Sequence, residues 1–247
     1  MMMSDPLPLL NKIILVTGSA RRIGRHVALA LAKNGADVLI HHAHSPAEAE
    51  SVRQEIQALG RKAEILQANL SDTAQTLALA DQILQHKPVY ALINNAAIFE
   101  PASFHSTDLQ SWQRHLDINL TAPFLLSQEF ARQIEPGTPG KIINILDWRA
   151  MRPSNDHFPY SISKAGLAAL TQAMAVSLAP NISVNGLAFG AVLPPSDGGK
   201  AKKVLRDTPI KRLASLKEVS QTILFLLTGP AYMTGDIIYL DGGRHLV

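Results

Sequence analysis

Hydrophobic and polar positions divide the chain into short apolar runs and longer segments that carry apolar residues on one side. The runs are rich in isoleucine, valine and leucine, which is typical of strands buried on both faces of a sheet. The longer segments begin near serine, aspartate or proline, and several end at glycine, as helices do. We expect strands at 12–17, 36–41, 62–68, 89–94, 141–146, 182–188 and 236–240, and helices at 25–34, 46–59, 71–86, 108–133, 160–178 and 217–227.

This alternation predicts an α/β fold. We expect a single Rossmann-type, doubly wound domain over residues 1–247, with a seven-stranded parallel sheet flanked by helices and ligands beyond the carboxyl ends of the strands. A barrel is the main alternative, but it needs eight strand-helix units and the chain supplies fewer. Residues 1–10 are expected to form an N-terminal tail, and the segment 190–212 is irregular.

Composition excludes several classes of protein. The 247 residues are 47% hydrophobic and 17% charged, which is globular composition. The formal net charge of +3 comes without a dense basic block, so we expect no nucleic-acid partner. There are no cysteines and the nine histidines are scattered, so we expect no metal. We see no export signal or membrane span, which predicts a soluble, cytoplasmic protein with no membrane partner.

A glycine-rich turn, T-G-S-A-R-R-I-G, follows the first strand. Such a turn lets the backbone approach a pyrophosphate at the start of a helix. An ordinary tight turn is the alternative, but here a strand precedes the turn and a helix follows it. We therefore expect a dinucleotide cofactor to contact Gly18, Arg21, Arg22, Ile23 and Gly24.

The end of the second strand distinguishes between the two nicotinamide dinucleotides. Its sequence, H-H-A-H-S at 41–45, lacks the carboxylate that would hold the ribose hydroxyls of NAD(H) and repel a 2′-phosphate. His41, His44 and Ser45 could donate hydrogen bonds to that phosphate. We therefore expect NADP(H); the alternative is a solvated loop that happens to be rich in histidine.

Tyr160 and Lys164 are a candidate pair for proton transfer. They are four residues apart, so on a helix they lie on one face. The ordinary pKa of a phenol is about 10, and we expect the ammonium, together with an oxidised nicotinamide, to lower it. Asp147 stands at the end of a strand, thirteen residues before Tyr160, where the loop would turn it toward the same cleft.

The chain resembles the short-chain dehydrogenase/reductase family over essentially its whole length, through the glycine turn, N-N-A-A at 94–97, Asn119 and Tyr160-x-x-x-Lys164. The resemblance implies that Lys164 binds the nicotinamide ribose and lowers the pKa of Tyr160, that Tyr160 transfers the proton, and that Asn119 holds a water. It also implies a homotetramer that uses the helices beginning near residues 108 and 160. The other cofactor contacts that it implies are Asn69, Leu70, Asn95, Ala96 and Gly190.

Asp147 departs from the family pattern, in which a serine donates to the substrate carbonyl. An ionised carboxylate cannot donate and would repel an alkoxide, whereas a carboxyl group suits the protonation of a ring nitrogen. Together with Arg22, Phe99, H-x-x-H-S and the D-G-G-R-H-L ending, it makes the chain resemble the pteridine reductase branch of the family, including bacterial dihydromonapterin reductases. This resemblance implies a pterin-like substrate that stacks on Phe99 and contacts Arg22, Asp147 and Tyr160.

The sequence thus predicts an NADPH-dependent reductase of a dihydropterin, such as dihydromonapterin, dihydrobiopterin or dihydrofolate, with Tyr160 and Asp147 supplying the proton. Two alternatives stay open: a carbonyl reductase acting on a ketone or 3-oxoacyl substrate, and a non-catalytic NADP-binding scaffold. Asp147 could also do no more than cap the loop that follows it. The segment 190–212 is placed like the substrate lid of the family, and Phe189 replaces a proline that is usual there.

Overall fold

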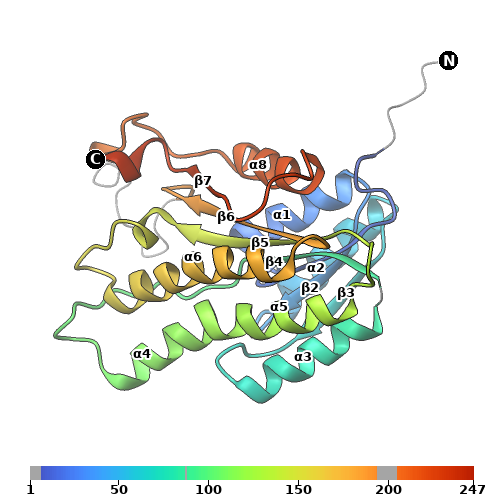
Figure 1. Ribbon diagram of the computed structural model, residues 1–247, viewed down its shortest axis with the longest axis horizontal. Helices are drawn as coiled ribbons and strands as arrows, with labels where there is room; N and C mark the ends of the chain where they lie inside the picture. Colours follow the sequence, from blue (N-terminus) through green and yellow to red (C-terminus); the bar gives the residue numbers. More distant parts are fainter. Residues whose placement is uncertain (1–6, 87, 194–204) are drawn as a thin grey trace.

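One parallel sheet forms the centre of the molecule in the computed structural model, which describes residues 7–86, 88–193 and 205–247. The described residues form seven strands in the spatial order β3-β2-β1-β4-β5-β6-β7 (Figure 1). The strand order reverses between β1 and β4, which is where ligands bind in doubly wound sheets. The strands are β1 Ile13–Val16, β2 Asp37–His42, β3 Ala63–Gln67, β4 Val89–Asn94, β5 Gly140–Asp147, β6 Ile182–Phe189 and β7 Ile237–Leu240.

Helices cover both faces of the sheet (Figure 1). Helices α1, α2 and α8 pack on one face around a core that includes Val27 and Val219, and α3, α5 and α6 pack on the other around Leu126 and Met174. The helices are α1 Arg22–Lys33, α2 Pro46–Ala58, α3 Thr73–Gln85, α4 Leu109–Leu116, α5 Ala122–Gln133, α6 Phe158–Leu178 and α8 Leu216–Thr228. Two short 3₁₀ helices are η2 Trp148–Ala150 and η3 Arg244–Leu246.

The architecture confirms the predicted Rossmann-like α/β fold with a seven-stranded parallel sheet. The sheet is open, with β3 and β7 as its edges, so the alternative of a closed barrel is wrong. The seven predicted strands are all present, within two residues of the expected bounds. The reason is that most are central strands covered on both faces, and such strands are read reliably from continuous apolar runs.

Three local predictions need correction. Helix α1 begins at Arg22, not at residue 25, because the glycine turn leads directly into it. Helix α3 begins at Thr73, not at residue 71, because its first turn is capped by Asp72, whose side chain accepts from the backbone N–H of Gln75. Part of the predicted tail is attached to the fold, because Leu9 is 1% exposed and packs in the core.

The predicted helix 108–133 is one helical segment with a widened turn in its middle. Helix α4 continues into a π-helical turn, η1 Asp117–Thr121, and then into α5. Pro123 lies just beyond this turn, and a proline lacks an N–H and crowds the carbonyl four residues earlier, here that of Asn119. We attribute the widened turn to Pro123; such turns are common at functional sites.

Within the described residues, no helix has the length and apolar character needed to cross a membrane. Of the predicted lid 190–212, residues 194–204 lie outside the described residues. Phe189, at the end of β6, is buried in the core beneath α1 and α8. The carboxyl ends of β1, β4 and β5 all lie at one edge of the sheet, which brings the glycine turn, Asn95 and Asp147 to the same side.

Candidate active site

The glycine turn packs too closely for side chains at two of its positions. Gly18 has φ of 64°, in the left-handed region that favours glycine. A Cβ added to Gly24 would overlap the carbonyl oxygen of Gly18 and lie 2.6 Å from Asn95 Nδ2. Arg21, the N-cap of α1, makes no side-chain capping bond, so the first backbone N–H groups of the helix are not capped by it. The turn therefore fits a phosphate group, which such N–H groups bind.

Asn95 and Thr17 join the turn to β4. The backbone N–H groups of Asn95 and Ala96 each donate to Thr17 Oγ1 at 2.9 Å, and Asn95 Nδ2 donates to the carbonyl oxygen of Thr17 at 2.8 Å. Thr17 was not singled out from the sequence, although it directly precedes Gly18. This network fixes the spacing between the ends of two strands that border the cofactor site.

His41 supports the glycine turn, and this corrects its predicted use as a phosphate donor. Its Nδ1 accepts from the backbone N–H of Gly18 at 3.0 Å, and its Nε2 lies 3.1 Å from the carbonyl oxygen of Ala68, to which it can donate. Burial lowers the pKa of His41 to about 4, so the ring is neutral at neutral pH. Both ring nitrogens are therefore used inside the protein, and neither is free for a 2′-phosphate.

A cavity of about 650 Å³ extends along this edge of the sheet, a size typical of a cofactor or substrate site. Its lining includes twelve of the predicted cofactor residues: Gly18, Arg21, Arg22, Ile23, Gly24, His41, His44, Ser45, Asn69, Leu70, Asn95 and Ala96. His42, Ile98, Arg114 and Ile118 also line it and were not predicted. Gly190 does not line it; a Cβ there would lie 2.7 Å from the Cα of Asp241, so close packing against the end of β7 explains this glycine.

Asp147 and Tyr160 form a partly buried hydrogen-bonded pair. The Tyr160 hydroxyl donates to Asp147 Oδ2 at 3.2 Å, and Asp147 Oδ1 accepts from the backbone N–H of Arg149 at 2.8 Å. One oxygen thus caps η2 while the other faces the tyrosine. The capping role and the contact with Tyr160, which the sequence left as alternatives, occur together.

The electrostatics of the pair differ from the prediction. Burial raises the pKa of Asp147, and the nearby charge of Arg149 offsets part of that rise. Burial, followed by the charge of Asp147, raises the pKa of Tyr160 well above its ordinary value. The expected lowering of the Tyr160 pKa is therefore wrong for these residues alone, because the loss of solvent and the neighbouring carboxylate outweigh the opposing charge of Arg149.

Lys164 is itself buried, with 2% of its surface exposed. Its Nζ donates to the carbonyl oxygen of Ile145 at 2.6 Å and lies 5.9 Å from the centre of the Tyr160 ring. Burial lowers the pKa of Lys164 to about 8, with the charge of Asp147 acting in the opposite direction. Its predicted contact with a nicotinamide ribose stays a prediction.

Asn119 lies in the π-helical turn and holds the loop after β4. Its Oδ1 accepts from the backbone N–H of Ile98 at 3.0 Å, and its Nδ2 donates to the carbonyl oxygen of Ile98 at 3.1 Å and to Ser163 Oγ at 3.0 Å. Ser163 Oγ in turn donates to the carbonyl oxygen of Tyr160. These bonds connect Asn119 with the tyrosine, while its predicted water-holding role stays a prediction.

Two residues that the sequence did not single out, His157 and Arg149, contact Phe99 beside the tyrosine. The ring of His157 stacks on Phe99 with centroids 3.8 Å apart, and Phe99 meets Tyr160 edge-on at 4.7 Å. The guanidinium of Arg149 lies 5.4 Å from the centre of the Phe99 ring and 3.7 Å from Asp147 Oδ1. Arg149 comes two residues after the end of β5. This was the one feature of the sequence that could have indicated its place beside Asp147.

Comparison with known proteins identifies the family. Residues 12–204 match the family described as short chain dehydrogenase. The chain belongs to this family. Short-chain dehydrogenases use NAD(P), and the chain is an NAD(P)-dependent oxidoreductase. This confirms the family predicted from the glycine turn, Asn119 and Tyr160-x-x-x-Lys164.

Short-chain dehydrogenases of different named activities resemble the chain. A 3-oxoacyl-[acyl-carrier-protein] reductase of Synechocystis sp. is 34% identical, over 94% of this chain and 96% of that protein. An L-xylulose reductase of Caenorhabditis elegans is 36% identical, over 94% and 95%. Among solved structures, FolM alternative dihydrofolate reductase 1 from Brucella canis, complexed with NADP, has a TM-score of 0.88 and 33% identity over 96% of this chain and 95% of that one. The substrate is therefore not decided by similarity.

Proposed function

We propose that the protein uses NADPH to reduce a dihydropterin ring, with Asp147 and Tyr160 supplying the proton. The observation that carries this proposal is the partly buried 3.2 Å hydrogen bond between the Tyr160 hydroxyl and the Asp147 carboxyl group. A carboxyl group whose pKa is raised keeps its proton to higher pH and can then give it to a ring nitrogen. The FolM structure from Brucella canis supports the same choice of substrate class.

The lining of the large cavity fits NADP(H). The turn from Gly18 to Gly24 would hold the pyrophosphate, and Arg21, His44 and Ser45, which line the cavity, would donate to a 2′-phosphate. Glu100 is the one carboxylate among the described residues of the lining, and it is paired with Arg114. Structures of two relatives, FolM from Brucella canis and a short chain dehydrogenase from Burkholderia cenocepacia, contain NADP. The bound cofactor supplies the hydride.

The residues of the pair have distinct parts in the proton transfer. Because the pKa of Tyr160 is raised well above its ordinary value, the negative charge left after proton release resides on Asp147. That carboxylate is stabilised by the Tyr160 hydroxyl, by the backbone N–H of Arg149 at 2.8 Å and by the Arg149 guanidinium at 3.7 Å. In this scheme Asp147 gives the proton to the substrate. Tyr160 holds the Asp147 carboxyl group in place and shares its hydroxyl proton with it through the hydrogen bond.

A carbonyl reductase is the second candidate, and the 3-oxoacyl-[acyl-carrier-protein] reductase of Synechocystis sp. favours it. That reaction develops negative charge on the substrate oxygen, which a neighbouring carboxylate would repel. The two candidate functions therefore differ in whether they need the proton of Asp147. Pterin reduction requires its proton, and ketone reduction does not.

An NADPH consumption assay with dihydropterins and simple ketones side by side tests the proposal. We expect turnover of at least one dihydropterin, and we expect Asp147→Ser to lower its kcat about 100-fold, the order of a lost general acid. Asp81→Ser, which removes an exposed carboxylate on α3, is the control and should leave kcat unchanged. Ketone turnover that does not need Asp147, without pterin turnover, would favour the second candidate; no turnover of either would indicate a scaffold.

A further inference from the structure

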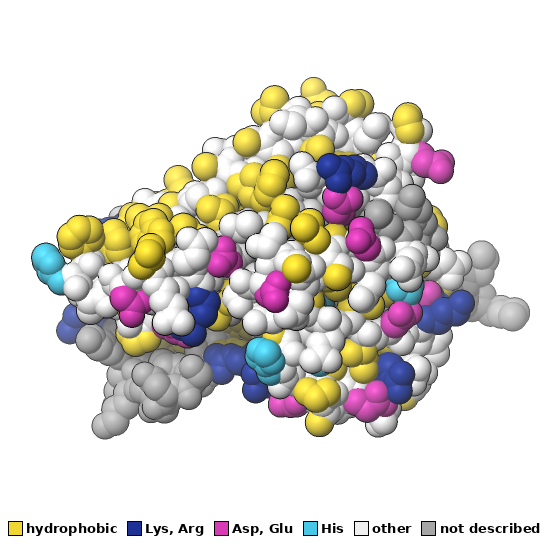
Figure 2. Space-filling view, turned by 90° about the horizontal axis from the view of Figure 1, so that it is seen from below, with side chains coloured by type: hydrophobic (Ala, Val, Ile, Leu, Met, Phe, Trp, Pro, Cys, Tyr) yellow, Lys and Arg dark blue, Asp and Glu magenta, His cyan; other side chains and the backbone are white. Residues whose placement is uncertain are grey.

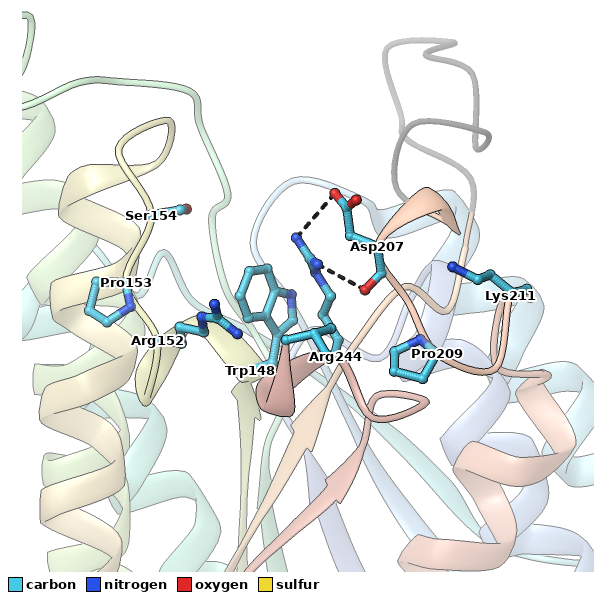
Figure 3. A pocket seen from close by; sticks show the side chains of 9 residues that line it. Trp148, Arg152, Pro153, Ser154, Asp207, Pro209, Lys211 and Arg244 are labelled. Carbon is cyan, nitrogen blue, oxygen red and sulfur yellow. Dashed lines mark hydrogen bonds and ion pairs between the residues drawn. The ribbon is translucent and has the colours of Figure 1, made fainter.

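A second cavity, of about 600 Å³, lies beyond the proton-transfer pair. Among the described residues it shares no lining residue with the cofactor cavity. Three parts of the chain that are distant in sequence meet there: the loop after β5, the segment 207–211 and the carboxyl-terminal η3 (Figure 3). Its lining residues are Trp148, Arg152, Pro153, Ser154, Asp207, Pro209, Lys211, Arg244 and Val247.

The cavity adjoins the reaction site through Trp148. This residue directly follows Asp147, and its indole carries two guanidinium groups, Arg149 at 4.7 Å and Arg244 at 4.8 Å from the ring centre. Arg149 reaches Asp147 and Phe99 on the other side. A ligand group in the cavity would therefore be separated from Asp147, the proton donor, by the Trp148 indole and the Arg149 side chain.

The side chains that line the cavity carry more positive than negative charge. Three cationic side chains and one acidic side chain line it, and the carboxylate of Asp207 is held by Arg244, which also donates to the Asp207 carbonyl oxygen at 2.9 Å (Figure 3). Arg206 also contacts Asp207, at 3.2 Å. In the described part of the chain, neither Arg152 nor Lys211 has an acidic partner. The Lys211 ammonium donates to the carbonyl oxygen of Arg206 at 2.6 Å.

The arrangement has the chemistry of an anion site. A guanidinium and an ammonium that face one concave space raise the local concentration of anions, and a guanidinium binds carboxylate or phosphate through two parallel hydrogen bonds. The indole of Trp148, which is largely buried and carries the Arg149 and Arg244 guanidinium groups, forms one wall of this space. No part of the proton-transfer scheme uses Arg152, Lys211 or Arg244.

We propose that this cavity binds an anionic group, a carboxylate or a phosphate, at the end of the substrate that is remote from the reacting ring. The inference rests on the proposed function and narrows it, because it selects dihydropterins with an anionic extension over uncharged ones. The anionic end of the extension would bind to Arg152 and Lys211.

Steady-state kinetics with a matched pair of substrates tests this selection. Dihydrofolate carries a carboxylate-bearing extension and dihydrobiopterin does not. We expect Arg152→Gln and Lys211→Gln each to raise the ratio of the KM for dihydrofolate to the KM for dihydrobiopterin about tenfold, the size of one charge-assisted hydrogen bond. Lys217→Gln, which removes an exposed lysine on α8, is the matched control and should leave the ratio unchanged. An unchanged ratio in both cavity variants overturns the proposal.

A binding measurement tests the cavity even if no pterin is reduced. In a Trp112→Phe background the fluorescence of Trp148 reports on the cavity alone, because the chain has two tryptophans. We expect 4-aminobenzoyl-glutamate, a carboxylate probe, or phenyl phosphate, a phosphate probe, to quench this fluorescence, and Arg152→Gln to weaken the stronger probe about tenfold. Which probe binds identifies the anion. Failure of both probes, or quenching unaffected by Arg152→Gln, contradicts an anion site, whatever the outcome with pterins.

Discussion

At the scale of single residues, burial determines the chemistry of the titratable groups near the sheet edge. Desolvation raises the pKa of Asp147 and lowers the pKa values of His41 and Lys164, because in each case it disfavours the charged form. The sequence identified these residues by type and spacing. It could not give the direction of the tyrosine shift, because that depends on how completely the folded chain excludes water from Tyr160.

His41 gives a prediction for stability at acid pH. Its folded-state pKa is about 4 against an ordinary 6.5, so the stability that it contributes is present above pH 6.5 and is lost as the pH falls toward 4. The full difference between the two pKa values corresponds to about 3 kcal/mol in the free energy of unfolding. His41→Asn keeps an acceptor for Gly18 but cannot titrate, so its free energy of unfolding should fall less between pH 6.5 and 4.

Urea unfolding at a series of pH values measures this effect. His44→Asn, which replaces an exposed histidine three residues away, is the control and should follow the wild type. Parallel curves for the wild type and His41→Asn would show that the ring does not titrate with folding.

At the scale of elements, the turn between β1 and α1 was predictable because glycines mark it in the sequence. The π-helical turn between α4 and α5 was not, since a periodic pattern over 108–133 does not distinguish an α-helix from one widened turn. Arg149, His157 and Trp148 were also missed. Trp148 and Arg149 lie in the short helix η2 and His157 is the N-cap of α6, and only the folded chain brings them beside Phe99 and Asp147.

Gly24→Ala should damage the cofactor site specifically. The added Cβ would overlap the Gly18 carbonyl oxygen, which is backbone, so the turn must move. We expect a loss of about 1–3 kcal/mol in the free energy of unfolding, as for other overpacked sites, and at least tenfold weaker NADPH binding by fluorescence titration. Gly166→Ala is the control, because its Cβ would meet only the flexible end of the Leu120 side chain, at 2.9 Å. Equal NADPH affinity in both variants would contradict the fit.

At the scale of the whole molecule, the prediction of a homotetramer stays a proposal. Large hydrophobic side chains are exposed on the helices that it would use, Leu109 on α4, Phe124 on α5 and Val176, 83% exposed, on α6. The face seen in Figure 2 carries groups of hydrophobic side chains with few charges among them. Such surfaces mark association sites in soluble proteins.

Size-exclusion chromatography with light scattering tests this association. We expect a mass of four times the 26.7 kDa chain, and Phe124→Glu or Val176→Glu should reduce it, because an interface would bury the new charge. Tyr232→Glu, at a fully exposed position in the turn before β7, is the control and should leave the mass unchanged. If the wild-type protein is a monomer, the proposal of a homotetramer is wrong.

The parallel stack of His157 on Phe99 has a consequence for the entropy of ligand binding. One face of the phenylalanine ring is held by the imidazole, and half of the side chain remains exposed. A side chain that becomes fixed only when a ligand arrives loses about 0.5–1.5 kcal/mol of rotational freedom at that moment. Because His157 and Arg149 already hold the ring, a ligand that contacts its exposed part meets a fixed side chain, and the loss of rotational freedom has occurred during folding.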